Sequence, residues 1–536
     1  RLGYAPGDWL FYVTGGFAWT YNQQSLTQVS TGNGTAPYLW RLGWTAGAGV
    51  ETTIAPHWTA RLEYLFTDFG QHTINYFDGA QPVRSNWRVN EVRVGLNYFF
   101  GGGQDQASDT PATPDDDRIS LHGQSTLTAQ GYTRFRSPYQ GANSLPGGGE
   151  GRETFDATLY AGVRLWQGAE LWVNPEIDQG FGVANTHGLA GFSSGEAYKK
   201  GTTYPYTLLN RFFIRQTIDL GGAALSIDAD QNQFARKATE NRIVLTVGKF
   251  SVTDIFDTNK YANNARVQFL NWALINAGTF DYAADAWGYT YGAAVEWYQG
   301  DWTLRGGLFD LSKTPTGGSF SQSGYGLDPS FGQFQVDSEI EHRHRLWGQP
   351  GALKITGFVS DGRLGSFKAA NFLSLSTGLD PSDALAAVRH YQTRSGVSIN
   401  LQQQVTENVG IFARAGVSNG NVEPVDFTDI DRTVSAGVSV NGKQWGRPDD
   451  TVGVGGVING IAPVHRNYFN LGGLGILIGD GQLPKYGNEK IAEAYYSLGV
   501  AKGLDLTFDY QFVDAPAYNL QRGPASIFAL RLHFEI

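Results

Sequence analysis

Short alternations of apolar and polar residues recur along the whole chain, and no apolar run is long enough for a helix across a bilayer. Inside lipid, only a helix or a closed β-barrel satisfies every backbone N–H and C=O group. The final stretch predicts a transmembrane barrel strand, with a half-buried strand of a soluble sandwich as the alternative interpretation. One face of it carries Phe528, Leu530, Leu532, Phe534 and Ile536, and the other carries Ala529, Arg531, His533 and Glu535.

Composition limits the function before any motif is considered. The mean hydropathy of −0.28 is that of a soluble protein, but the polar lumen face of a barrel offsets its lipid face. The chain has no cysteine, which excludes disulfides, zinc–thiolate centres and catalytic thiols. A net charge of −10 and the lack of a basic stripe argue against a nucleic-acid partner.

Residues 118–536 predict a closed, all-β, antiparallel transmembrane barrel of about 16 strands. Short turns alternate with long connections, as periplasmic turns alternate with external loops in outer-membrane barrels. The connection 220–240 is long where a short turn is due, which leaves room for an extra hairpin at 224–231. A helix is predicted over 380–391, with Asp380 or Ser382 as its N-cap. The predicted strands are 119–133, 154–166, 169–178, 207–219, 241–250, 288–299, 301–312, 333–345, 351–361, 390–403, 408–419, 431–442, 451–460, 489–500, 503–514 and 525–535.

Residues 101–117 read GGGQDQASDTPATPDDD without periodicity, which predicts a flexible linker rather than a long surface loop. Only four strands are predicted before it, at 9–21, 40–52, 57–67 and 91–100. Four strands cannot close a barrel, and open edges in lipid leave backbone groups unpaired. The predicted domains are therefore a partial small outer-membrane barrel at 1–100, the linker at 101–117 and a sixteen-stranded barrel at 118–536.

The stretches RLGYAPGDWLFYVTGGFAW (1–19), GWTAGAGVE (43–51) and WTARLEYLFTDFG (58–70) carry a family signal. They resemble the C-terminal half of small eight-stranded outer-membrane barrels of the opacity/porin-like family. We therefore expect the front half of that small barrel to precede Arg1. Several chains that pool their four strands into one barrel, or a soluble role for the segment, are the alternatives.

The loop after the fifth predicted strand of the larger barrel contains GKFSVTDIFDTNKYANN (248–264) and FLNWAL (269–274). With LLNRFFIRQTIDLGG (208–222) and EAYYSLGVAKGLDLTFDYQFVDAP (493–516), these phrases resemble the carbohydrate-selective porin family of the OprB type. The resemblance covers most of 118–536. It implies a sixteen-stranded channel, monomeric or trimeric by member, that passes mono- and small oligosaccharides by diffusion.

The third external loop, 251–287, is predicted to fold inward and narrow the pore; a loop stiffened by its own aromatic residues is the alternative. Its carboxylates and amides suit sugar hydroxyls, and its rings suit the CH faces of sugars. Alternation also places acids and bases on one lumen face, which favours neutral polar solutes; for any single charge, a solvated wall residue is the alternative. The candidate pore residues are Arg164, Glu176, Arg211, Arg215, Lys249, Asp254, Asp257, Asn259, Arg266, Asn271, Trp272, Glu339, Glu341, Arg343, Arg394, Arg414, Glu493 and Asp509.

The sequence gives weaker support for metal sites and catalysis. His342 and His344 share a strand face, but they are predicted to continue the lipid face near a turn. Asp426, Asp429 and Asp431 offer calcium ligands, although a solvated acidic loop is the favoured interpretation. No catalytic cluster or phosphate loop is recognisable, so we expect no enzyme, metal or cofactor.

The sequence thus predicts an integral protein of the outer membrane of a Gram-negative bacterium. It would act as a porin for passive, sugar-preferring diffusion of small polar solutes, narrowed by 251–287. Outer-membrane lipid, lipopolysaccharide and carbohydrate solutes are the expected partners, together with further copies of the chain in a homo-trimer. The alternative is a structural anchor or surface protein whose barrel is filled by apolar or mutually paired side chains.

Overall fold

The computed structural model describes residues 2–5, 9–24, 26–27, 34–35, 38–55, 58–76, 81–98, 118–197, 201–313, 315, 327, 329–427 and 429–536. The predicted linker 101–117 lies outside the described residues, as do Phe100 and most of the predicted loop 313–332. The chain divides into two compact units, Arg1–Pro111 and Ala112–Ile536.

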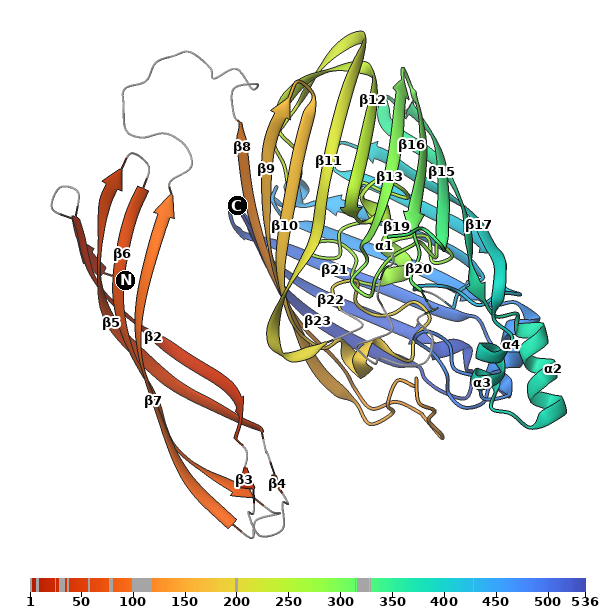
Figure 1. Ribbon diagram of the computed structural model, residues 1–536, viewed down its shortest axis with the longest axis horizontal. Helices are drawn as coiled ribbons and strands as arrows, with labels where there is room; N and C mark the ends of the chain where they lie inside the picture. The colour runs from red at the N-terminus through yellow and green to blue at the C-terminus, as the bar shows by residue number, and fades with distance from the viewer. Residues whose placement is uncertain are drawn as a thin grey trace. The chain divides into compact units, whose positions relative to one another are not determined.

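The larger unit is a closed barrel of sixteen strands in which each strand pairs antiparallel with its neighbours in the sequence (Figure 1). Closure joins the last strand to the first, with Glu535 opposite Gln124 and Ile527 opposite Tyr132. All sixteen predicted strands are present. They are β8 (Ile119–Tyr132), β9 (Glu150–Trp166), β10 (Ala169–Gly180), β11 (Thr202–Ile227), β12 (Arg236–Phe250), β13 (Thr290–Gln299), β14 (Trp302–Asp310), β15 (Phe334–Leu346), β16 (Gln349–Leu364), β17 (His390–Thr406), β18 (Val409–Ser418), β19 (Arg432–Asn441), β20 (Thr451–Gly460), β21 (Glu489–Ala501), β22 (Leu504–Asp514) and β23 (Ala525–Glu535).

The alternation of the sequence becomes an outer and an inner face of the barrel. On β23, Leu530 and Phe534 are exposed outward, whereas Arg531 is fully buried inside. The same dyad holds on β15, where Val336 is exposed and Asp337 is buried. Apolar side chains therefore cover the outside, as contact with lipid requires, and charged side chains collect in the interior.

Two long loops at one end of the barrel contain helices, which lie together in Figure 1. The β16–β17 loop holds α2 (Phe367–Thr377) and α3 (Pro381–Ala387), and the β20–β21 loop holds α4 (Pro463–Asn470). The predicted helix 380–391 begins as expected, because the Asp380 side chain accepts the Ser382 N–H. It ends at Ala387 rather than residue 391, since β17 starts at His390. Among the described residues, no helix is both long and apolar enough to cross a membrane.

The long connection 220–240 holds no separate hairpin, so that expectation was wrong. Strands β11 and β12 continue pairing through it, from Ala224 opposite Thr239 to Ile227 opposite Arg236. A register shift at Gly221 and Gly222, both with positive φ, carries the ladder past the irregular stretch. The turn itself spans only residues 228–235.

The smaller unit is a five-stranded antiparallel sheet with two edges, in the order β1-β2-β5-β6-β7. Its strands are β1 (Leu2–Tyr4), β2 (Trp9–Gln23), β5 (Tyr38–Ala55), β6 (Trp58–Tyr76) and β7 (Gln81–Tyr98). Two-residue strands β3 (Leu26–Thr27) and β4 (Gly34–Thr35) pair beside it. β6 and β7 extend well beyond the predicted spans, because residues 71–76 of β6 pair with residues 81–86 of β7.

Candidate functional site in the barrel interior

Residues 251–287 are held by inward-facing side chains from strands around the barrel. The Asp257 N–H donates to Glu339 of β15 at 2.8 Å. The Asn259 amide donates to Asn400 of β17 at 2.7 Å, and the Asn271 N–H donates to Glu493 of β21 at 3.0 Å. A short helix, α1 (Trp272–Ile275), starts at this last contact, with Asn271 as its N-cap. The segment therefore lies inside the barrel.

Arg414 of β18 is the main anchor of this segment, and it is fully buried. Its Nε lies 3.3 Å from the Asp257 carboxylate. Its two terminal nitrogens donate to the carbonyls of Leu274 and Ala262, at 2.7 and 2.8 Å. One guanidinium thus joins three points of the segment to the wall, which suits its planar fork of donors.

A charge network lines β13–β15. Arg305 pairs with Glu296 at 2.9 Å and with Glu339 and Glu341 at 2.7 Å each. Arg343 lies 3.4 Å from Glu341. Glu339, Glu341 and Arg343 were predicted pore residues. Arg305 was not among them, although alternation along β14 places it on the lumen face.

A second set of charges lies where the segment leaves and re-enters the wall. Arg211 forms a two-pronged pair with Asp254, at 2.7 and 2.8 Å. Lys249 pairs with Asp285 at 3.0 Å. A bulge in β11 leaves Asn210 without an opposite residue, because Asn174 pairs with Arg211 and Pro175 with Leu209. Asn210 and Arg211 consequently both face the lumen, a register effect that alternation alone does not reveal.

The remaining candidates form further polar clusters. Arg266 lies 3.4 Å from Asp156 and 3.9 Å from Glu176, and it donates to the Tyr160 hydroxyl at 2.9 Å. Asp509 lies 3.4 Å from Arg531, beside the strand that carries Glu493.

Arg394 also contacts the segment 251–287. It is fully buried between Asp281 of that segment and Asp431, at 3.6 and 3.5 Å. Arg164 and Arg215 contact the 228–235 turn instead, through the carbonyls of Ala235 and Asn232.

Trp272 is 4% exposed and sits in an aromatic stack. Its ring centroid lies 5.0 Å from that of Phe192 and 5.1 Å from that of Phe427, both nearly parallel. Tyr282 packs against the same group at 5.5 Å. Both faces of the indole are occupied, so Trp272 stabilises the packing of the loops and offers no free ring to a solute in this structure.

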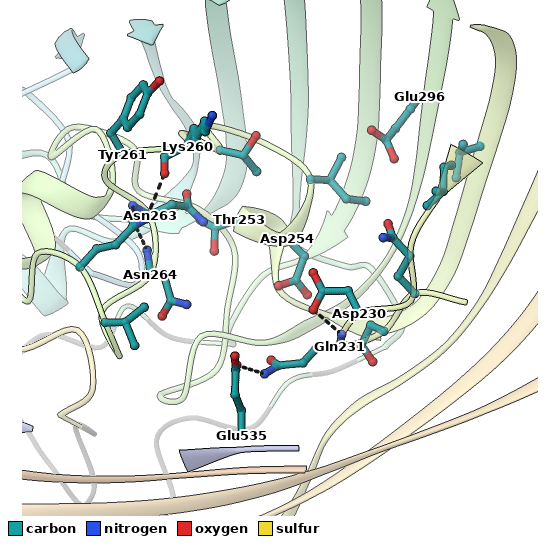
Figure 2. A pocket seen from close by; sticks show the side chains of 18 of the residues that line it. Asp230, Gln231, Thr253, Asp254, Lys260, Tyr261, Asn263, Asn264, Glu296 and Glu535 are labelled. Atoms are coloured by element: carbon teal, nitrogen blue, oxygen red, sulfur yellow. Dashed lines mark hydrogen bonds between the residues drawn. The ribbon is translucent and has the colours of Figure 1, made fainter. Parts of the chain in front are cut away.

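A polar cavity of about 1040 Å³ lies beside the segment (Figure 2). Among the predicted pore residues, Arg215 and Asp254 line it. Its other lining residues on the segment were not among the predicted pore residues. They include Lys260, Tyr261, Asn263 and Asn264, all within the phrase that carries the family signal.

The structure also shows the surroundings of the histidines and aspartates that the sequence offered as weaker candidates for metal sites. The His342 ring packs on Trp302, with centroids 4.4 Å apart, and His344 contacts Gln403 at 3.0 Å. The expectation of a solvated acidic loop was wrong. Asp426, Asp429 and Asp431 are buried, because they accept hydrogen bonds from loop backbone and side chains: Ala284 N–H to Asp426, Ile476 N–H to Asp429, and Ala462 N–H to Asp431. No metal-holding group of His, Cys, Asp and Glu occurs in the described part of the chain.

Comparisons with known proteins bear on the fold and the family of this chain. The structure of Pseudomonas putida OprB at high pH superposes with a TM-score of 0.58 at 16% identity, covering 78% of this chain and 94% of that one. The N-terminal part resembles the 31 kDa outer-membrane immunogenic protein of Brucella melitensis, 37% identical over 105 residues. A 25 kDa outer-membrane immunogenic protein of Brucella abortus is 33% identical over 101 residues.

The chain covers 42% and 43% of those two curated relatives, less than half of each, and each match spans 19% of this chain. The model of the family described as "Carbohydrate-selective porin, OprB family" matches residues 142–536. That match takes in the inward segment, the charged walls and the closing strand. The chain therefore belongs to the OprB family of carbohydrate-selective porins and is an integral outer-membrane protein.

Proposed function

We propose that this porin passes mono- and small oligosaccharides by passive diffusion, and that residues 251–287 narrow the route. The observation that carries the proposal is the anchoring of this segment to β15, β17, β18 and β21 beside a cavity with polar walls. Charges of both signs line the same interior, such as Arg305 with Glu296. A mixed wall bonds neutral hydroxyl-bearing solutes without selecting ions of one sign.

Liposome swelling tests this function directly. Vesicles that carry the protein should swell with glucose, maltose and maltotriose at rates that fall with size, and faster than with large anions of similar size. Single-channel current should also fall as sugar is added. Vesicles without protein are the control. Swelling that is no faster than in this control would refute the proposal.

A filled structural barrel is the second candidate, and a specific observation favours it. The Trp272 stack and the buried Arg414–Asp257 pair fill parts of the interior with mutually paired bulky groups. Such a barrel would conduct no ions. A measurable single-channel conductance excludes it, even where sugars have no effect on the current.

We further propose contact with outer-membrane lipid and lipopolysaccharide and assembly as a homo-trimer. The support is an apolar hollow of about 730 Å³ on the outer face of β16–β20, lined by Val397, Val417, Val434 and Ile458. Native mass spectrometry in mild detergent should give three copies of the chain. A spectrum of single chains only would contradict the trimer and leave the channel proposal intact.

A further inference from the structure

The turn between β11 and β12, residues 228–235, folds back into the barrel; we call it the inward turn. Phe234 is 2% exposed and packs 5.1 Å from Trp172 of β10. The Asn174 amide donates to the Asn232 side chain at 2.8 Å, and Arg215 donates to the Asn232 carbonyl at 2.6 Å. These partners are lumen-facing side chains. The inward turn is thus part of the interior rather than a free connection.

The inward turn also extends toward the closing seam. The Gln231 amide donates to the Glu535 carboxylate of β23 at 3.3 Å. In the barrel order, β8, β9 and β10 separate β23 from β11. Asn232 has a φ of +57°, a left-handed conformation that asparagine adopts more readily than most residues. The turn therefore crosses part of the opening at the end of the barrel that has short turns.

The cavity of about 1040 Å³ lies between the inward turn and the segment 251–287 (Figure 2). Asp230 and Gln231 line it from the turn, and Lys260, Asn263 and Asn264 line it from the segment. Its volume is at the upper end of the range of about 300–1000 Å³ found for small-molecule sites.

Two polar side chains that line this cavity, Asn263 and Arg242, offer an amide and a guanidinium. An amide both donates and accepts hydrogen bonds, and a guanidinium donates them. A hydroxyl group can pair with either.

We propose that the inward turn and residues 251–287 enclose a solute-binding station near the periplasmic mouth, which holds a neutral mono- or disaccharide. The inference rests on the proposed function and adds a binding place to it. The wall carries Arg242 and Lys260 as well as Asp230, Glu296 and Glu535, so neither an anion nor a cation is favoured. Sugar hydroxyls suit the amide of Asn263 and the guanidinium of Arg242, since both residues line the cavity.

Two variants test the station by single-channel conductance and by the sugar concentration that halves the current. The first replaces residues 228–235 by Asn-Gly. This two-residue turn would connect Ile227 directly to Arg236, which are already paired across the two strands. The second, Asn263→Leu, keeps the turn and removes only the amide. Glu407→Gln, at an exposed turn, is the matched control.

The shortened turn should raise the conductance. Both variants should weaken sugar block about 2- to 10-fold, the loss of one neutral hydrogen bond, while the control leaves it unchanged. Sugar block equal to wild type in both variants would overturn the station and leave the proposed function standing. Wild-type current that responds to no sugar, with no swelling, would overturn both.

Discussion

The two sheets of this protein share one sequence pattern, but one closes into a barrel and the other is a five-stranded sheet with two edges. Both alternate apolar and polar residues, and both bury charge on one face, as with Arg41 in the small sheet and Arg531 in the barrel. The barrel gives each strand two partners, whereas β1 and β7 of the small sheet have one each. Alternation thus specifies strands and faces, but closure depends on the number of strands that can meet.

Separating the two units tests the comparison most severely. Residues 118–536 alone should insert and fold, because every strand in this unit has both partners. Residues 1–100 alone should give no folded species that resists detergent. Electrophoretic mobility with and without heating measures both, and conductance compares the first fragment with the full chain. A barrel fragment that folds only in the presence of the small sheet would show that closure is not self-sufficient.

Arg414→Met should produce the next largest effect. It leaves the Asp257 carboxylate buried without its guanidinium partner, which costs about 3–5 kcal/mol of unfolding free energy. It also removes the donors to Leu274 and Ala262, so residues 251–287 should loosen and the conductance should rise. Denaturant unfolding and single-channel recording measure the two effects. Glu407→Gln is again the neutral comparison, and unchanged conductance would show that the segment is held by other contacts.

Matched substitutions ask whether both sheets face lipid. Leu530 in the barrel and Leu62 in the small sheet are 42% and 52% exposed on the apolar faces of their strands. An arginine on a lipid face costs about 2–4 kcal/mol near the bilayer centre. Leu530→Arg and Leu62→Arg should therefore lower the stability of the protein in liposomes by similar amounts. A cost at Leu530 alone would indicate that the small sheet does not meet lipid.

A pH effect confined to the barrel loops is the smallest expected. His465 is fully buried between Asp431, at 3.0 Å, and Asp429, at 3.3 Å. Burial alone would lower the pKa of His465, but Asp431 and Asp429 raise it above the usual 6.5. Burial would likewise raise the pKa of Asp431, but His465 and Arg394 hold it down at about 2.

The stabilisation by protonated His465 is complete below pH 6.5 and is lost as the pH rises through its raised pKa. The stabilisation by ionised Asp431 is complete above pH 3.8 and is lost as the pH falls through about 2. At pH 5 both act, and His465→Gln should cost about 1.5–3 kcal/mol, the size of one charged hydrogen bond. The difference from wild type should shrink in alkaline solution. Thermal unfolding at several pH values measures it, and a difference that is independent of pH would refute a charged His465.

Much of the barrel follows from residue order alone. Alternation placed Asp337, Glu339 and Glu341 on one face of β15, and all three are buried in the interior. Strand ends were less accurate, since β11 runs from Thr202 to Ile227 where 207–219 was predicted. The extension of β11 contains Gly221 and Gly222, and the register shifts there interrupt the alternation that marks a strand in the sequence.

The partners within the interior could not be read in the same way. The contact of Arg305 with Glu339 depends on the register between β14 and β15, which a single sequence does not show. The stack of Trp272 with Phe192 and Phe427 joins three separate loops, so no local sequence pattern predicts it. The inward turn is similar, because its position depends on contacts with other strands, such as that of Phe234 with Trp172.

The seam between β8 and β23 has a consequence for biosynthesis. Thr126 and His533 touch across it, although 407 residues separate them in the chain. The first barrel strand, β8, is synthesised long before β23, so one of its two edges has no strand partner until the end of the barrel is made. Assembly should be slow for a chain of this topology. Loss of β23 alone would leave β8 and β22 each with an unpaired edge, and such edges promote aggregation.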